Sequence, residues 1–249
     1  MYIPVIEVKR IHKGVSCCCA VTVWTEVEDA LEKIIGNYEK VNHVISAFQD
    51  DRARKIGLHK IGHINGVALE LGSGPGNYSK MISRFNDGPL ICVDYLAKMH
   101  VAAHRRNHDL DHHYIRGVFE ALPIREASMG FVTAAYALRD SLNKPLAIME
   151  ACETLRTDGK FLLIDIGKPD NPLIRGFMSV FMKYAVPVLG GLVAGYGYRN
   201  PWSKLYLTFE KLPPNNNLVS IVSRHVCVVD RIEKILGAIV IILGIRGCD

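Results

Sequence analysis

Residues 67–77 read Val67-Ala68-Leu69-Glu70-Leu71-Gly72-Ser73-Gly74-Pro75-Gly76-Asn77, and this stretch decides the fold of the chain. An apolar run ends beside a carboxylate and then turns on glycines at alternate positions. Apolar runs bounded by glycine are typical of buried parallel strands that lead into a tight loop. Because glycine adopts positive φ and has no side chain, a ligand can lie against bare backbone there. We therefore predict a strand at 66–71, a glycine loop, and a helix at 77–85.

Two kinds of nucleotide ligand fit such a loop. A dinucleotide fold needs a third glycine at position 77, which is Asn77 here, and its pyrophosphate would be repelled by Glu70. S-adenosylmethionine (SAM) has no phosphate, and its ammonium and sulfonium groups suit a carboxylate. A second apolar run, 89–94, ends at Asp94, where an acid can accept both ribose hydroxyls. The pattern favours a SAM site, and a glycine turn with two surface acids is the alternative.

Composition indicates one large globular domain of the cytoplasm. The chain has 249 residues, of which 49% are hydrophobic and 22% are charged, enough for a full core. The net charge of +5 is spread along the chain without a Lys/Arg block, so no nucleic-acid partner is expected. Seven cysteines without CxxC pairs indicate free thiols in a reducing compartment.

Strand and helix patterns alternate along most of the chain, which predicts an α/β fold with a doubly wound, mostly parallel sheet. The last strand is expected to be antiparallel, because Gly237 suggests a tight return from the strand before it. The seven predicted strands are 66–71, 89–94, 113–117, 130–136, 160–167, 226–234 and 237–245.

We expect residues 1–24 to form an N-terminal hairpin, since they alternate and are rich in Val, Ile and Thr. Residues 9–24 also resemble a signal peptide, but they follow an apolar segment and lack a small-residue cleavage site. Residues 25–249 are expected to form one SAM-binding domain. Helical spacing predicts helices at 26–40 and 41–58, ahead of the first strand, where they could cover the cofactor.

An insertion is predicted at 171–214. Its segment 173–193 is apolar and is interrupted at Pro187 and at Gly190-Gly191, which favours two short amphipathic helices over a membrane span. This helical cover over the substrate side implies an apolar substrate or a peripheral contact with a membrane surface. Plain core packing is the alternative.

Arg139 and Asp140 follow the strand 130–136. Ligands of open α/β sheets bind outside the carboxyl ends of the strands, so both residues are placed for chemistry, and an ordinary ion pair is the alternative. His100, His104 and His108 recur every four residues on the predicted helix 97–108 and could bind a transition metal. Because no acid is interleaved with them, we predict a solvated face and no metal.

Five further segments match the pattern of one enzyme family. They are Tyr38-Glu39-Lys40-Val41-Asn42-His43-Val44-Ile45-Ser46, Glu120-Ala121-Leu122-Pro123, Ala137-Leu138-Arg139-Asp140, Asp165-Ile166-Gly167-Lys168-Pro169 and Phe181-Met182-Lys183-Tyr184-Ala185-Val186-Pro187. With these segments the chain resembles the ubiquinone/menaquinone biosynthesis C-methyltransferases, which are class I SAM-dependent enzymes with a Rossmann-like sheet. The resemblance runs from about residue 38 to residue 244 and implies methylation of a ring carbon on a prenylated quinol.

The resemblance also implies roles for single residues. Two departures stand out: Val118 replaces the Asp or Asn before the adenine, and Asp140 replaces the Asn after the arginine. An arginine is a poor proton acceptor, so we expect Arg139 to act as a cation that stabilises a phenolate. The implied SAM residues are Glu70, Gly72, Ser73, Gly74, Gly76, Asp94, Tyr95, Val118, Phe119, Glu120 and Ala135; the catalytic residues are Arg139, Asp140 and Tyr38; and the substrate residues are Asn42, Tyr136, Phe181 and Tyr184.

Three other functions remain open at this point. The same fold could methylate another small apolar molecule or a lipid. It could methylate RNA or protein, although enzymes acting on base amino groups usually carry Asn/Asp-Pro-Pro-Tyr where residues 134–137 read Ala-Ala-Tyr-Ala. It could also be a non-catalytic module that only binds partners. The intact glycine loop argues against this last alternative.

Overall fold

The computed structural model describes residues 6–7, 35, 38–195 and 200–247. One sheet forms its centre, with the strand order β1-β4-β3-β2-β5-β6-β8-β7. Strand β8 runs antiparallel to β6 and β7, whereas the other neighbours are parallel. The strands are β1 (Ile6–Glu7), β2 (Ala68–Leu71), β3 (Leu90–Asp94), β4 (His112–Arg116), β5 (Met129–Ala135), β6 (Leu155–Ile166), β7 (Cys227–Lys234) and β8 (Ile239–Ile245).

The predicted seven-stranded sheet with an antiparallel last strand is confirmed. The return between β7 and β8 has Gly237 at φ +91°, in the left-handed region that glycine tolerates. Strand β1 adds an eighth, two-residue strand that pairs with β4 at the edge of the sheet. The rest of the predicted hairpin at 1–24, and most of the predicted helix at 26–40, lie outside the described residues.

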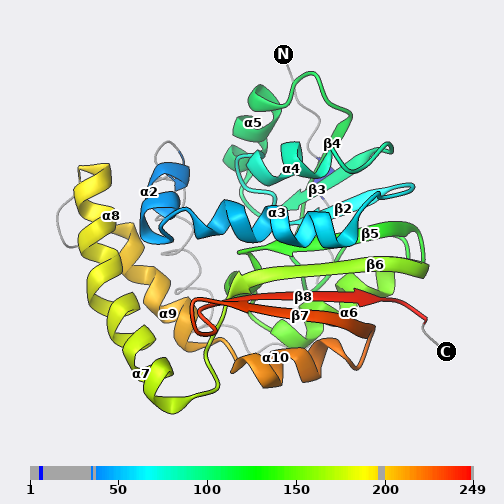
Figure 1. The fold of residues 1–249 in the computed structure, drawn as a ribbon. Helices are drawn as coiled ribbons and strands as arrows, with labels where there is room; N and C mark the ends of the chain where they lie inside the picture. The colour runs from blue at the N-terminus through cyan, green and yellow to red at the C-terminus, as the bar shows by residue number, and fades with distance from the viewer. Residues whose placement is uncertain (1–5, 8–34, 36–37, 196–199, 248–249) are drawn as a thin grey trace.

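Helices cover both faces of the sheet (Figure 1). Strand side chains alternate between two apolar cores, so one strand contributes to both. The helices α6 (Lys144–Thr154) and α10 (Asn215–Val222) close the first core. The second core is closed by α3 (Gln49–Ile61), α4 (Asn77–Ile82) and α5 (Ala97–Arg106).

A third apolar cluster builds a helical cap beside the sheet (Figure 1). Val41 of α2 packs there with Met182, Val186, Trp202 and Phe209, all of which are buried. The cap consists of α2 (Tyr38–Ile45), α7 (Pro172–Val180), the π-helical turn η2 (Phe181–Ala185), α8 (Val186–Ala194), the 3-10 turn η3 (Pro201–Lys204) and α9 (Leu205–Glu210).

The predicted break within 173–193 is wrong, because α7, η2 and α8 follow one another as a continuous helix over Pro172–Ala194. Pro187 cannot donate to the carbonyl four residues earlier, and the π-helical turn just before it absorbs the mismatch. The Trp202 ring packs directly on Gly190, where a Cβ would lie 2.9 Å from the ring. Among the described residues, this helix is long and apolar enough to cross a membrane by length and composition.

The predicted single helical run at 41–58 is also wrong. Helix α2 ends at Ile45 and α3 begins at Gln49, because Ala47 and Phe48 both adopt positive φ, at 49° and 62°. The Phe48 amide donates to the His43 carbonyl at 2.7 Å and closes the turn. The turn re-aims the chain, so that α2 joins the cap while α3 lies on the sheet (Figure 1).

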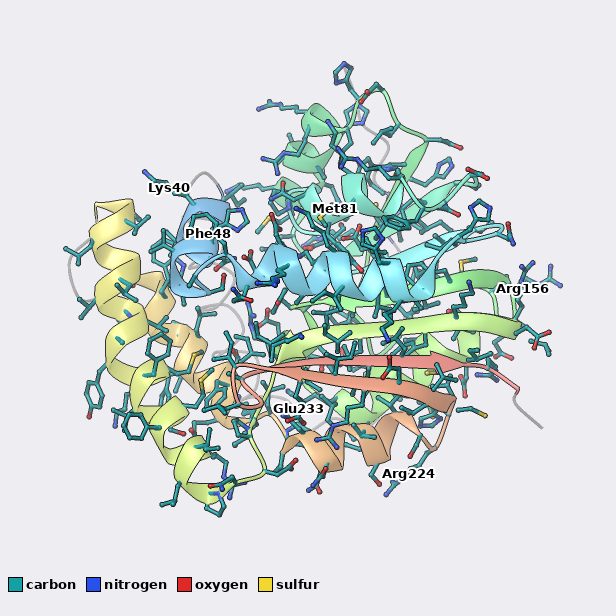
Figure 2. All side chains as sticks on the ribbon, viewed as in Figure 1. Lys40, Phe48, Met81, Arg156, Arg224 and Glu233 are labelled. Atoms are coloured by element: carbon teal, nitrogen blue, oxygen red, sulfur yellow. The ribbon has the colours of Figure 1, made fainter. Side chains whose placement is uncertain are left out.

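The direction of the strands places the functional end of the sheet. Arg156 is the second residue of β6 and lies at the end of the sheet far from α7 and α8 (Figure 2). Strand β6 therefore runs toward the cap, and so do the strands parallel to it. The carboxyl ends of these strands, where open α/β sheets bind ligands, face the cap.

Candidate active site

The glycine loop between β2 and α4 is tight and bare. The amides of Gly72 and Ser73 donate to the Val93 carbonyl at 2.8 and 3.2 Å, which fixes the loop to the neighbouring strand. Gly72 has φ +69°, and a Cβ there would lie 2.3 Å from the Ala137 Cβ. Gly74 also has positive φ, but open space surrounds it. The loop thus packs against the segment that leads to Arg139 and leaves backbone free for a ligand.

Glu70 is a buried carboxylic acid, with 1% of its surface exposed. The Ser79 hydroxyl donates to its Oε2 at 2.5 Å. Burial raises the pKa of Glu70 to about 8, and this effect exceeds the opposing influence of Ser79 and of the Arg54 charge. A buried carboxylate of this kind gains most from a cationic ligand that pairs with it.

Asp94 holds two loops together. Its Oδ2 accepts from the Gly74 amide at 2.8 Å and its Oδ1 accepts from the Leu96 amide at 2.9 Å. Behind it, Nε2 of His100 lies 3.2 Å from the Asp94 carbonyl and 3.1 Å from the Ile115 carbonyl. His100 is fully buried, so the prediction of a solvated histidine face is wrong for this residue. It ties α5 to the ends of β3 and β4.

The residues expected around the adenine follow the carboxyl ends of β3 and β4. Tyr95 and Val118 are 37% and 41% exposed, as a ligand wall would be. Phe119 reaches to within 3.1 Å of the position of a Cβ on Gly72. Glu120 has a structural partner, because its Oε1 accepts from the backbone amides of residues 142 and 143 ahead of α6. A contact of these four side chains with the cofactor stays a prediction.

Arg139 lies at the carboxyl end of β5 in a buried cluster of charges. It is 4% exposed, its amide donates to Oδ2 of Asp165 at 3.2 Å, and its Nε lies 3.6 Å from Oδ1 of Asp140. Burial raises the pKa of Asp165 to about 6 and also raises the pKa of Asp140, although Arg139 opposes both shifts. Arg139, Asp140 and Asp165 therefore form a buried triad in place of the expected pair, and the sequence pattern indicated no role for Asp165.

The predicted substrate residues fall into two groups. Tyr136 follows β5 with φ +61°, and its hydroxyl is buried without a hydrogen-bond partner among the described residues. Asn42 is half-buried in α2, where Tyr38 is the first residue, although the Tyr38 side chain lies outside the described part. Phe181 and Tyr184 are 37% and 53% exposed on the π-helical turn η2 of the cap. The structure brings Tyr136 to the strand ends with Arg139, whereas Phe181 and Tyr184 stand on the cap.

Arg54 is a residue of this site that sequence analysis missed. Its guanidinium carbon lies 5.8 Å from the Tyr78 ring centre and 5.2 Å from that of Tyr136. In the sequence it is one of several basic residues in a predicted helix, and nothing in the pattern distinguishes it. Only the packing of α3 on the sheet places it beside the glycine loop and the end of β5.

Comparison with known proteins now assigns the family. A model described as the ubiE/COQ5 methyltransferase family matches residues 21–242. The chain belongs to this family. The ubiquinone/menaquinone biosynthesis C-methyltransferase UbiE of Hahella chejuensis is 28% identical over 179 residues, which cover 68% of this chain and 71% of that enzyme. The demethylmenaquinone methyltransferase of Lactiplantibacillus plantarum is 24% identical, over 75% of this chain and 83% of that enzyme.

Solved structures agree on the fold. The N-methyltransferase NodS from Bradyrhizobium japonicum WM9, in complex with S-adenosyl-L-homocysteine, superposes with a TM-score of 0.64 at 10% identity. The match covers 90% of this chain and 100% of NodS. The sheet is thus that of a class I methyltransferase, and the family resemblance stated from the sequence is confirmed.

As a member of this family, the protein is an enzyme that uses SAM as methyl donor. The residues in and beside its glycine loop fit that donor. Gly72 leaves no room for a side chain on the loop, and Glu70 offers a buried carboxylate to a cation. The Ser73 Oγ is buried without a hydrogen-bond partner among the described residues, as a group that awaits a ligand would be. Which of these atoms contact the donor is a prediction.

Proposed function

We propose that this methyltransferase transfers a methyl group to a ring carbon of a prenylated hydroquinone, of the demethylmenaquinol type. The relatives named for quinone biosynthesis support this substrate class. The observation that carries the proposal is the position of Arg139. Its buried guanidinium belongs to the segment that begins at Ala137, which packs against Gly72 of the glycine loop. A cation there can stabilise an oxyanion close to the methyl donor.

In the proposed reaction the ring carbon becomes nucleophilic when a neighbouring hydroxyl loses its proton. When bound, SAM would supply an electrophilic methyl group on a sulfonium, and cleavage of the bond between that methyl carbon and sulfur would leave S-adenosylhomocysteine. Arg139 holds the phenolate oxygen by charge-assisted hydrogen bonds and so orients the ring. Asp140, 21% exposed and with its pKa raised by burial, takes the hydroxyl proton directly or through a water. The methylated ring carbon then releases its own proton to solvent, which restores the aromatic ring.

The substrate class can be tested with a short-tailed demethylmenaquinol and labelled SAM. We expect label in a C-methylated product and none when the ring is supplied as the oxidised quinone, since the quinone carbon is not nucleophilic. The same ring without a tail should turn over with a higher KM, because the apolar tail contributes about 0.8 kcal/mol per buried CH₂. Label in a lipid extract or in RNA, but in no prenylated hydroquinone, would overturn the proposal.

The second part of the proposal concerns the exposed side of the cap helix 172–194, the outer face of the cap. Leu173, Phe177 and Leu192 are 82%, 83% and 77% exposed on one side of the helix 172–194. The same helix carries Arg175 and Lys183, which match the charge of anionic lipid. Its other side is buried in the cap, so we propose that a cytoplasmic enzyme rests on a bilayer surface through this face and does not cross it.

Substituting Leu173→Ser and Phe177→Ser together should weaken binding to anionic vesicles about 10- to 100-fold, since two buried apolar side chains are lost. Cosedimentation measures the effect, and turnover of a short-tailed substrate should stay near wild type. Val229→Ser removes a 55% exposed apolar side chain from β7 and serves as the matched control. Equal vesicle binding by all three proteins would contradict a lipid contact at this face.

A further inference from the structure

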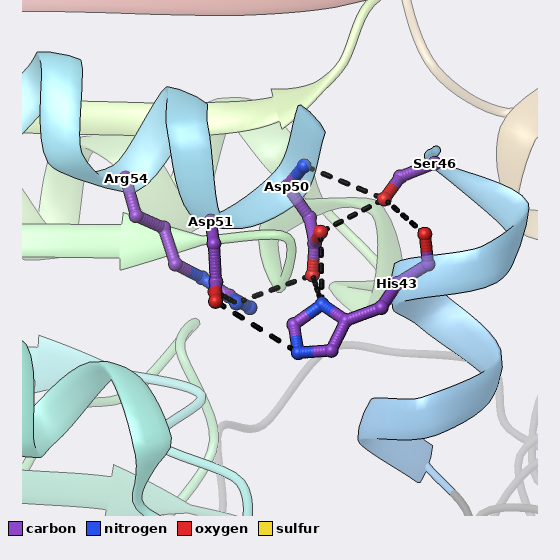
Figure 3. A network of polar contacts seen from close by, with 5 residues as sticks. All are labelled: His43, Ser46, Asp50, Asp51 and Arg54. Carbon is purple, nitrogen blue, oxygen red and sulfur yellow. Dashed lines mark hydrogen bonds and ion pairs between the residues drawn. The ribbon is translucent and has the colours of Figure 1, made fainter. Parts of the chain in front are cut away.

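A polar network links Arg54 of α3 to the end of α2 across the turn between the two helices (Figure 3). Nη1 of Arg54 donates to Oδ1 of Asp51 at 2.9 Å and to Oδ2 of Asp50 at 3.5 Å. Asp50 is held in turn by the Ser46 hydroxyl at 2.8 Å and by Nδ1 of His43 at 2.8 Å. The aspartates therefore fix the position of the guanidinium, whose charge opposes theirs, and Ser46 and His43 hydrogen-bond Asp50.

The network uses one side of the guanidinium only. The bonds to Asp50 and Asp51 both leave from Nη1, and Nε is buried with no hydrogen-bond partner among the described residues. A guanidinium carries five N–H donors in a planar fork, and its Nε–Nη2 edge is shaped to hold a carboxylate through two parallel bonds. The Arg54 side chain is 12% exposed, so water does little to satisfy that edge. The edge is prepared for an anionic partner that none of the described residues supplies.

The position of the Arg54 guanidinium indicates which anion it binds. The guanidinium lies over the rings of Tyr78, which follows the glycine loop, and Tyr136, which follows β5. It is near enough to Glu70 for its charge to lower the pKa of that acid. A cationic side chain and a buried carboxylate thus flank the same loop end. The methionine part of SAM carries a carboxylate and an ammonium on one carbon, which is the complementary pair.

We propose that Arg54 binds the α-carboxylate of the methyl donor, while Glu70 faces its ammonium, and that Asp50 and Asp51 are positioning residues for Arg54. The proposal rests on SAM as the donor but not on the identity of the methylated ring. It assigns a donor contact to the segment between the cap and the sheet, outside the glycine loop.

The test compares two ligands in calorimetry: S-adenosylhomocysteine and its decarboxylated analogue, which lacks only the carboxylate. Wild type should bind S-adenosylhomocysteine about 10- to 100-fold more tightly than the analogue, the range expected for a charge-assisted pair. In Arg54→Met the two affinities should become equal, through loss of S-adenosylhomocysteine affinity alone. Arg52→Met removes the same charge from an exposed position of α3 and should keep the wild-type ratio.

Arg54→Lys provides a second variant that keeps the charge in the buried network. It should discriminate between the ligands less than wild type does, because an ammonium lacks the planar fork. An unchanged ratio in Arg54→Met or Arg54→Lys, or an equal loss for both ligands, would overturn the assignment. Failure of wild type to bind S-adenosylhomocysteine at all would instead remove SAM as the donor, a result distinct from either of these.

Discussion

Glu70→Gln is expected to make the ligand-free protein more stable at pH 8 and to weaken donor binding at the same time. Glu70 has a raised pKa of about 8 in the folded state, against an ordinary value of 4.5. Its contribution to stability is therefore fully present below pH 4.5 and is lost as the pH rises through 8. The neutral amide avoids that loss, which amounts to roughly 3–5 kcal/mol across the interval.

The expected effect on donor affinity is opposite to the effect on stability. A cation beside Glu70 favours the ionised form, so wild-type affinity for S-adenosylhomocysteine should rise from pH 6 to pH 8 as the acid becomes easier to ionise. Glu70→Gln should lose about 10- to 100-fold in affinity at pH 8 and lose the pH dependence with it.

Chemical denaturation at several pH values and calorimetry measure the two effects. Glu126→Gln, which removes the same charge from an exposed loop, should change neither. A Glu70→Gln protein that is less stable than wild type at pH 8 would contradict the raised pKa of Glu70. One that binds the donor as well as wild type would show that the acid does not face the donor's cation.

Arg139→Met is expected to abolish most turnover and to leave donor binding nearly intact. Loss of one oxyanion-stabilising donor costs about 10²- to 10³-fold in kcat. Asp165 and Asp140 would be left without their buried cation, and their pKa values should rise further, because the Arg139 charge lowers both in the wild type. A raised pKa makes the two carboxyls easier to protonate, which limits the cost to folding. Affinity for S-adenosylhomocysteine should stay within about threefold, since the donor is proposed to bind at the glycine loop.

Single-turnover rates separate this effect from product release. Arg139→Lys keeps the charge and should retain more activity than Arg139→Met, while Arg125→Met, in an exposed loop, should be fully active. Full activity of a folded Arg139→Met protein would remove Arg139 from the catalytic role.

The sheet was predictable because its signals are local. The apolar runs that became β2, β3, β5 and β8 are bounded by glycines or acids, and each was found within a few residues. Glu70, Asp94 and Arg139 were found for the same reason, because all three stand at the carboxyl ends of such runs or within a few residues of them.

The cap was less predictable because its local signals conflict with its packing. Pro187 and Gly190 are helix breakers in isolation, yet a π-helical turn accommodates one and the Trp202 ring packs on the other. His100 looked like a surface residue because helical spacing says nothing of what covers that side. Arg54 carries no pattern at all, since its role depends on α3 crossing the sheet.

The pairing of β6 with β8 has a consequence for biosynthesis. Strand β6 ends at Ile166, but the strand that covers its open side begins only at Ile239. Until that later segment emerges from the ribosome, Leu162, Leu163 and Ile164 form an apolar edge with unpaired amides. Translation pauses or premature stops in this interval would leave a nascent chain prone to aggregate, and chaperones that shield strand edges should be needed most at that stage.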